Sequence, residues 1–152
     1  MINTTLCYIE KDNRYLMLHR TKKENDLNEG KWIGVGGKFE KNETPEECLL
    51  REVKEETGLT LTKYRLRAVI TFISNLWETE YMYLFTANEF TGEVTECSEG
   101  VLEWVNKEEV MKLNLWQGDR IFLKKIMKED NFFTLKVVYE GEQLVESVVE
   151  DY

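Results

Sequence analysis

Residues 36–59 read GGKFEKNETPEECLLREVKEETGL, and this segment carries the signals of a glycine-rich loop followed by a capped helix. Thr44 is a favourable N-cap residue, and Pro45 occupies the first helical position, where a missing N–H costs nothing. An acidic residue stands three positions after the cap, as in a capping box, and Gly58 supplies a left-handed stop. The spacing therefore predicts a helix of about four turns from Thr44 to Thr57.

Three glutamates of this helix share one stripe of its surface. At about 100° per residue, Glu55 lies to one side of Glu52 and Glu56 lies to the other, while Leu49 and Val53 face a core. Carboxylates at this spacing repel one another and destabilise a helix. A bound hard cation such as Mg²⁺ or Mn²⁺ attracts all of them and removes that cost. The stripe therefore predicts a metal site. A solvated acidic face is the alternative that the carboxylates alone leave open.

The same segment contains a longer pattern of fixed residue types. Gly37, Glu43 and the run from Arg51 to Leu59 follow the pattern G-x5-E-x7-R-E-U-x-E-E-x-G-U, in which U is aliphatic. Every fixed position matches, so the segment resembles the Nudix box, and the chain resembles Nudix hydrolases of the MutT-like type. The resemblance implies an α+β fold, an α/β/α sandwich in which a mixed β-sheet lies between the Nudix helix and a C-terminal helix.

Length and composition fit one globular domain over residues 1–152, with 42% hydrophobic and 12% aromatic residues. The net charge is −9, from 20 basic and 29 acidic residues, and no basic stripe is present, which disfavours a nucleic-acid polymer as a partner. We find no apolar run long enough to cross a bilayer and no leader peptide, so we expect no membrane partner and a cytoplasmic location. A monomer and a homodimer both remain open.

Cysteine and histidine usage narrows the chemistry. Cys7, Cys48 and Cys97 are odd in number and widely spaced, which indicates reduced thiols. His19 is the only histidine. A zinc site and a Ser-His or Cys-His catalytic pair are therefore disfavoured.

Apolar, aromatic and β-branched runs predict strands at 3–10, 14–20, 64–72, 80–87, 101–105, 132–139 and 143–149. Polar and glycine-containing stretches predict turns or loops at 11–13, 24–31, 91–93 and 140–142, with a hairpin tip at 76–77. A short helix is predicted to begin at 106–109, and the last helix is predicted to run from about 115 to about 128.

The resemblance assigns catalytic roles on the Nudix helix to Arg51, Glu52, Glu55 and Glu56. Glu52 is the candidate general base, and its carboxylate would be oriented by Arg51 or by a neighbouring backbone group. Family members differ in which glutamate takes this role.

The metal ligands implied by the resemblance are the Gly36 carbonyl, Glu52, Glu55, Glu56 and one further loop glutamate. Glu99 matches that further position, and Glu96 is the fallback. A solvated loop glutamate is the alternative for both. Mg²⁺ is the expected cofactor, with Mn²⁺ as a substitute.

The strand at 14–20 ends in a basic group formed by Arg20, Lys22 and Lys23. Solvated charge is the favoured interpretation for the two lysines. In MutT-like enzymes the basic residue at the end of this strand approaches the substrate phosphates, which implies that role for Arg20. Thr5, on the preceding strand, matches a position that touches the nucleotide, although strand threonines are more often simply buried or solvated.

Three glycines in four residues, Gly34, Gly36 and Gly37, allow a ligand to approach the backbone closely. The motif alone is weak evidence for phosphate binding, but it directly precedes the acidic helix. Lys38 is a candidate phosphate contact, with a surface lysine as the alternative.

The segment around Trp116 and Asp119 resembles the segment with which oxidised purine nucleoside triphosphatases bind the base. Trp116 would stack on the base and Asp119 would hydrogen-bond to its edge. The alternative is a core tryptophan beside an N-cap aspartate. Phe72 or Met82 could line the same pocket. Ile33 departs from those relatives, which have an asparagine there, and an isoleucine can neither donate nor accept a hydrogen bond.

The resemblance implies hydrolysis of a nucleoside triphosphate to the monophosphate and pyrophosphate, with 8-oxo-dGTP as the leading substrate. The partner would then be a small nucleotide, and the role would be cleaning of the nucleotide pool. Two alternatives remain: another nucleoside diphosphate derivative, such as ADP-ribose, a dinucleoside polyphosphate or an RNA cap, and a non-catalytic nucleotide-sensing module. The complete set of box carboxylates disfavours the sensor.

Overall fold

The structure is a computed structural model that describes residues 1–22, 25–128 and 131–152. Its central helix, α1 (Pro45–Thr57), begins at Thr44, whose side chain accepts a hydrogen bond from the Glu47 backbone while the Glu47 side chain accepts one from the Thr44 backbone. The helix ends at Gly58, where φ is 82°. The predicted capping box and glycine stop are therefore confirmed.

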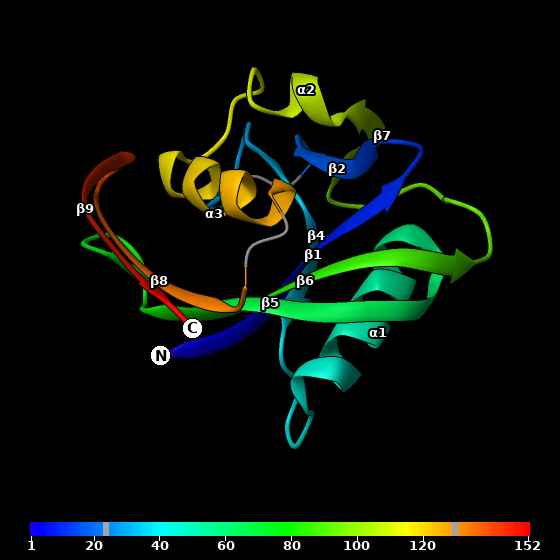
Figure 1. Ribbon diagram of the computed structural model, residues 1–152, viewed down its shortest axis with the longest axis horizontal. Helices are drawn as coiled ribbons and strands as arrows, with labels where there is room; N and C mark the ends of the chain where they lie inside the picture. Colours follow the sequence, from blue (N-terminus) through cyan, green and yellow to red (C-terminus); the bar gives the residue numbers. More distant parts are fainter. Residues whose placement is uncertain (23–24, 129–130) are drawn as a thin grey trace.

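The main sheet runs in the order β4-β1-β6-β5-β8-β9 (Figure 1). Its strands are β1 (Ile2–Lys11), β4 (Val35–Lys38), β5 (Thr60–Ser74), β6 (Glu80–Thr91), β8 (Phe133–Glu140) and β9 (Gln143–Asp151). The pairs β1–β6 and β5–β8 are parallel and the other pairs are antiparallel, so the sheet is mixed, as expected.

A second group of strands extends from the far end of β1. It contains β2 (Arg14–Arg20), β3 (Trp32–Ile33) and β7 (Gly100–Asn106), with β2 between the other two. The turn from β1 to β2 has positive φ at Asp12 and Asn13, which is the conformation of a two-residue hairpin turn. This pairing brings the end of β2 beside the start of β7.

Helices lie on both faces of the main sheet. Figure 1 shows α1 below the sheet, and α2 (Lys107–Val110) and α3 (Gln117–Met127) above it. Leu49 and Val53 of α1 are fully buried against the sheet, and Phe122 and Leu123 of α3 are buried on the other face. The expected α+β sandwich is confirmed.

Several boundaries differ from the sequence prediction. The strands β5 and β6 are longer than predicted, and the glycine-rich segment forms β3 and β4 where the prediction had only a close-approaching backbone. The last helix begins at Gln117 with Trp116 as N-cap, so Asp119 lies inside the helix and the N-cap alternative for Asp119 is wrong. Predictions for Lys23 and Glu24 lie outside the described residues.

The three cysteines are free and buried, which agrees with the expectation of reduced thiols. No helix in the described part of the chain combines the length and the apolar character needed to cross a membrane.

Candidate active site

The three glutamates of the predicted stripe on α1 divide between two environments. Glu52 and Glu56 point toward the sheet, with Glu56 only 8% exposed and the Glu52 side chain 16% exposed. The Glu55 side chain is 58% exposed and lies 3.4 Å from Arg51 Nη1. The predicted stripe thus consists of two inward carboxylates and one at the solvent boundary.

Glycines in β4 allow α1 to approach this closely. A Cβ on Gly37 would lie 2.5 Å from Glu52 Oε2, so a side chain there would occupy the space of the carboxylate. A Cβ on Gly36 would collide with the backbone oxygen of Thr5 on β1. The two glycines therefore serve different contacts: Gly36 lets β4 pack on β1, and Gly37 admits the Glu52 carboxylate.

Arg51 fixes the loop before the helix and orients the glutamate beside it. Its Nε and Nη2 donate to the two Glu43 oxygens at 2.7 and 2.9 Å, and Nη1 donates to Glu52 Oε1 at 2.7 Å. Nη2 also donates to the Lys38 carbonyl at 3.0 Å. The Arg51 hydrogen bond lowers the pKa of Glu43 to about 2. The predicted contact between Arg51 and Glu52 is present, whereas sequence reasoning did not connect Arg51 with Glu43.

Glu56 is the most perturbed carboxylate of the helix. Burial, followed by the charges of Glu99 and Glu52, raises its pKa to about 8, against the opposing effects of Arg20 and a hydrogen bond from the Gly36 backbone. Its Oε2 is buried and accepts no hydrogen bond from any described residue. A buried, unpaired oxygen of this kind suits a cation, because the lone pairs would otherwise remain unsatisfied.

Glu99, in the segment before β7, is held by a cationic side chain. Arg20 at the end of β2 donates from Nη1 to Glu99 Oε2 and from Nε to Asp26 Oδ2, both at 2.8 Å. Arg20 is paired with Glu99 and Arg51 with Glu52, so each of these two carboxylates contacts a guanidinium group. Across residues 1–22, 25–128 and 131–152, no group of three or more His, Cys, Asp or Glu side chains is close enough to hold a metal ion.

A cavity of about 650 Å³ is lined both by these carboxylates and by aromatic side chains, among them Phe72 and Trp116. At one end, called here the carboxylate end, it is lined by Arg20, Glu52, Glu56 and Glu99 together with Gly36, Gly37 and Lys38. Thr5 is buried in the wall with its hydroxyl 3.5 Å from Cys48 Sγ. Most predicted phosphate contacts therefore share one cavity.

The other end of the cavity, called here the aromatic end, is lined by Ile33, Phe72, Met82, Trp116 and Asp119. Trp116 is 5% exposed and its Nε1 donates to Asn28 Oδ1 at 2.8 Å. Phe72 packs edge-on against the indole, with 5.8 Å between the ring centroids. Burial is the main cause that raises the pKa of Asp119 to about 8.

One face of the Trp116 indole is covered by a lysine. Lys31 Nζ lies 4.9 Å from the centre of the Trp116 ring, and the same ammonium lies 2.9 Å from Glu142 Oε1. A base that stacks on Trp116 from this side would have to displace Lys31. Because Glu142 is largely exposed, its ion pair with Lys31 offers little resistance.

Some predicted residues lie apart from the cavity, and some lining residues were missed. Gly34, Glu55 and the fallback Glu96 are not among the described residues that line it. A Cβ on Gly34 would lie 2.6 Å from the Cys7 carbonyl, so this glycine serves strand packing. Sequence reasoning missed Glu80, although strand alternation predicts that Glu80 and Met82 share a face.

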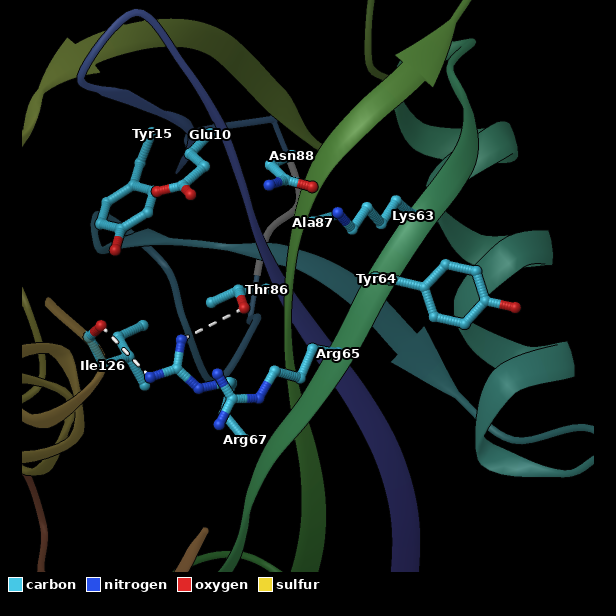
Figure 2. Close-up of a pocket in the computed structure, with 10 residues that line it drawn as sticks. All are labelled: Glu10, Tyr15, Lys63, Tyr64, Arg65, Arg67, Thr86, Ala87, Asn88 and Ile126. Atoms are coloured by element: carbon cyan, nitrogen blue, oxygen red, sulfur yellow. Dashed lines mark hydrogen bonds between the residues drawn. The ribbon is translucent and has the colours of Figure 1, made fainter. Parts of the chain in front are cut away.

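A second cavity, of about 230 Å³, lies near the end of β1, the start of β5 and the end of α3. Figure 2 shows the residues that line it. Its buried Arg67 donates to Thr86 Oγ1 at 3.3 Å and to the Ile126 carbonyl at 3.4 Å, which ties β5 to the end of α3. Arg65 and Lys63 lie beside it. No sequence-predicted site residue is among the described residues that line this cavity, and the Arg67 contacts indicate a structural role.

Comparison with known proteins identifies the class to which this fold and site belong. The NUDIX domain profile matches residues 2–126, and a Bacillus subtilis protein named uncharacterized Nudix hydrolase YvcI is 31% identical over 129 residues, 82% of this chain and 78% of that protein. The chain therefore belongs to the Nudix hydrolase family.

Further similarities point to the MutT type within that family. An oxidized purine nucleoside triphosphate hydrolase of Danio rerio is 30% identical over 112 residues, 72% of this chain and 71% of that protein. The crystal structure of a mutator MutT protein from Bacillus halodurans is 26% identical, with a TM-score of 0.89, and the match covers 99% of this chain and 98% of that one. This protein is a Nudix hydrolase of the MutT type.

Proposed function

We propose that the protein hydrolyses a nucleoside triphosphate to the monophosphate and pyrophosphate, with 8-oxo-dGTP as the leading substrate and Mg²⁺ as the cofactor. The observation that carries this proposal is the shared cavity, which has Arg20, Glu52 and Glu56 at one end and Trp116 and Asp119 at the other. A triphosphate at the carboxylate end would leave its base at the aromatic end. Proteins named oxidized purine nucleoside triphosphate hydrolase in Danio rerio and Mus musculus are among the relatives, which supports this class of base.

Glu52 and Glu56 would hold the cation together with the Gly36 carbonyl, and Glu99 would join them after leaving Arg20. The buried and unpaired Oε2 of Glu56 supports this assignment, because a hard cation satisfies such an oxygen. When bound, Mg²⁺ neutralises phosphate charge and lowers the pKa of a coordinated water. Glu55 lies nearer to solvent and would act at the outer edge of the set, and Mn²⁺ would substitute for Mg²⁺.

Glu52 is the proposed general base. Burial raises the pKa of Glu52, which strengthens its carboxylate as a proton acceptor, and the 2.7 Å hydrogen bond from Arg51 Nη1 fixes Oε1. A Cβ added at Gly37 would lie 2.5 Å from Oε2, and both residues line the cavity. The arginine thus keeps one oxygen occupied while the other is available to take a proton from the attacking water.

Positive side chains at the same end would bind the phosphates. Arg20 and Lys38 line the cavity, and Arg20 is released for a phosphate when its partner Glu99 turns to the cation. Guanidinium groups bind phosphate through two parallel N–H donors, which suits the triphosphate of the substrate. Thr5 and the backbone at Gly37 would complete the phosphate contacts, and Gly34 would act only by allowing the strand to pack.

The proposal is tested by pyrophosphate release from a panel that contains 8-oxo-dGTP, dGTP, ADP-ribose and a dinucleoside polyphosphate, with Mg²⁺ present. Pyrophosphate with monophosphate as the second product is expected from the triphosphates. Glu52→Gln and Glu56→Gln should each lower kcat by at least about a hundredfold, because each removes a charge that acts on the reacting groups. Glu46→Gln, on the exposed first turn of the same helix, is the matched control.

Equal turnover by wild type, Glu52→Gln and Glu56→Gln would remove the enzymatic assignment. Trp116→Ala should raise KM for purine triphosphates with a smaller change in kcat, since the indole would hold the base and not the reacting phosphorus. Preferential hydrolysis of 8-oxo-dGTP over dGTP would support a role in cleaning the cytoplasmic nucleotide pool.

A further inference from the structure

Glu80, at the start of β6, brings a carboxyl group to the aromatic end of the cavity. It lines the cavity together with Met82 of the same strand, and it is paired in the sheet with Phe72. Thr4 on β1 is buried and its hydroxyl donates to Glu80 Oε2 at 2.8 Å. This bond fixes one carboxyl oxygen and leaves Oε1 as an acceptor toward a ligand.

A second carboxyl group faces the same space. Asp119 on α3 lines the cavity, and after burial the charge of Glu80 is the next cause that raises the pKa of Asp119. The charge of Glu80 therefore acts on Asp119, and both residues line the same cavity. Ile33, which also lines the cavity, offers no donor or acceptor, whereas both carboxyls offer acceptors to a base.

We propose that Glu80 determines base specificity by accepting hydrogen bonds, together with Asp119, from a base edge that presents neighbouring N–H donors. This inference rests on the proposed function, in which the base occupies the aromatic end. The Watson–Crick edge of a guanine-type base presents a ring N–H and an exocyclic amine side by side, and a carboxylate can accept from both.

An adenine-type edge fits the same wall poorly. It presents a ring acceptor beside its amine, and an acceptor facing a carboxylate oxygen leaves both groups without a donor. Burial raises the pKa of both carboxyls, to about 8 for Asp119, and nearby cations only oppose it: Lys38 lowers the pKa of Glu80, while Lys31 and Arg120 lower that of Asp119. A carboxyl group keeps a carbonyl oxygen that accepts hydrogen bonds even when it is protonated, so Glu80 and Asp119 can accept from the guanine edge in either state.

A purely structural role for Glu80 would give a different result. In that case the Thr4–Glu80 hydrogen bond would only join β1 to β6, and its loss would lower stability or activity equally for every substrate. A residue that reads the base changes the ratio between substrates that differ only at the atoms it contacts.

The test measures kcat/KM for dGTP and for dITP, which lacks only the 2-amino group, in wild type, Glu80→Leu and Glu80→Gln. Wild type should prefer dGTP by about tenfold or more, because the unpaired carboxyl is costly with dITP. Glu80→Leu should bring the ratio close to one. Glu80→Gln preserves the shape and the Thr4 contact and should lower the ratio several-fold. Glu89→Leu, on the exposed outer part of β6, should leave the ratio unchanged.

A dGTP/dITP ratio that stays at the wild-type value in both Glu80 variants, with hydrolysis intact, would overturn the inference and leave the proposed function standing. Failure of the wild-type protein to hydrolyse any nucleoside triphosphate would overturn the proposed function, and the assignment of Glu80 with it.

Discussion

Arg20 and Glu99 form a 2.8 Å ion pair across 79 residues of sequence, between the end of β2 and the segment before β7. The resemblance to MutT-like enzymes implies different roles for these two residues, phosphate binding for Arg20 and metal binding for Glu99. In the structure they neutralise each other, and Asp26 holds the other side of the guanidinium. If Arg20 binds phosphate and Glu99 binds the cation, as proposed, opening of this pair would couple the two binding events.

Glu99→Gln should raise the Mg²⁺ concentration for half-maximal activity by about tenfold or more, because the affinity of an oxygen site depends on its number of charged ligands. Asp26→Asn should lower KM for the triphosphate with little change in Mg²⁺ requirement, since it releases Arg20 without touching the metal set. Activity titrated with Mg²⁺ at saturating nucleotide separates the two effects. Identical Mg²⁺ requirements in wild type and Glu99→Gln would exclude Glu99 as a ligand.

Gly37→Ala should greatly reduce activity while the fold is retained. The new Cβ would lie 2.5 Å from Glu52 Oε2, and the glutamate side chain can swing away at little cost in stability. That movement breaks the 2.7 Å contact with Arg51, so kcat should fall by about tenfold or more while the midpoint of thermal unfolding changes little. Gly36→Ala is the comparison, because its Cβ meets the rigid backbone of Thr5 and should destabilise the protein.

Local signals in the sequence were sufficient for the helix that carries the site. Thr44, Pro45 and Gly58 act within one or two turns of the chain, so the cap and the stop of α1 could be predicted without knowledge of the rest. The strand β2 was also predicted with correct bounds, because its apolar run is buried and its turn residues are characteristic.

Long-range contacts could not be predicted in this way. Gly36 and Val35 become strand residues only because β1 lies beside them, and composition gives no sign of that pairing. The division of the acidic stripe into inward Glu52 and Glu56 and outward Glu55 depends on how α1 rests on β4. The partner of Arg20 depends on β2 and β7 being neighbours in the sheet.

The metal-free protein should become less stable as the pH rises through the neutral range. Burial raises the pKa of Glu56 from 4.5 to about 8, so the folded state binds a proton that the unfolded state has released. The resulting stabilisation is fully present below pH 4.5 and is lost as the pH approaches about 8. Asp119, with a pKa of about 8, contributes in the same direction. Thermal unfolding in EDTA from pH 5 to about 9 measures the slope.

Glu56→Gln should reduce this slope, because an amide mimics the protonated acid at every pH. Glu55→Gln, which changes a solvent-exposed side chain, should leave the slope as it is. In wild type near neutral pH, Mg²⁺ binding should release close to one proton, since the ligand must ionise. Calorimetry in buffers of different ionisation enthalpy counts that proton. A slope that is the same in wild type and Glu56→Gln would show that Glu56 is ionised in the metal-free protein.

Tyr139→Phe should loosen the start of α3 and with it the aromatic end of the cavity. The Tyr139 hydroxyl accepts a 2.7 Å hydrogen bond from the Gly118 backbone, and its ring packs 5.0 Å from Trp116. Trp116, the N-cap of this helix, makes no side-chain cap hydrogen bond, so the phenol serves as the cap. Its loss leaves a buried donor unpaired and should lower the free energy of unfolding by about 1–3 kcal/mol.

The same change should raise KM for the triphosphate more than it lowers kcat, because Trp116 and Asp119 lie at the base and not at the reacting phosphate. Tyr152→Phe removes an equivalent hydroxyl from an exposed ring and is the matched control for both measurements. A Tyr139→Phe protein that unfolds earlier yet keeps the wild-type KM would show that the cap stabilises α3 without positioning the base. If Tyr139→Phe lowered kcat by the same factor for triphosphates of every base, the substitution would act at the carboxylate end instead.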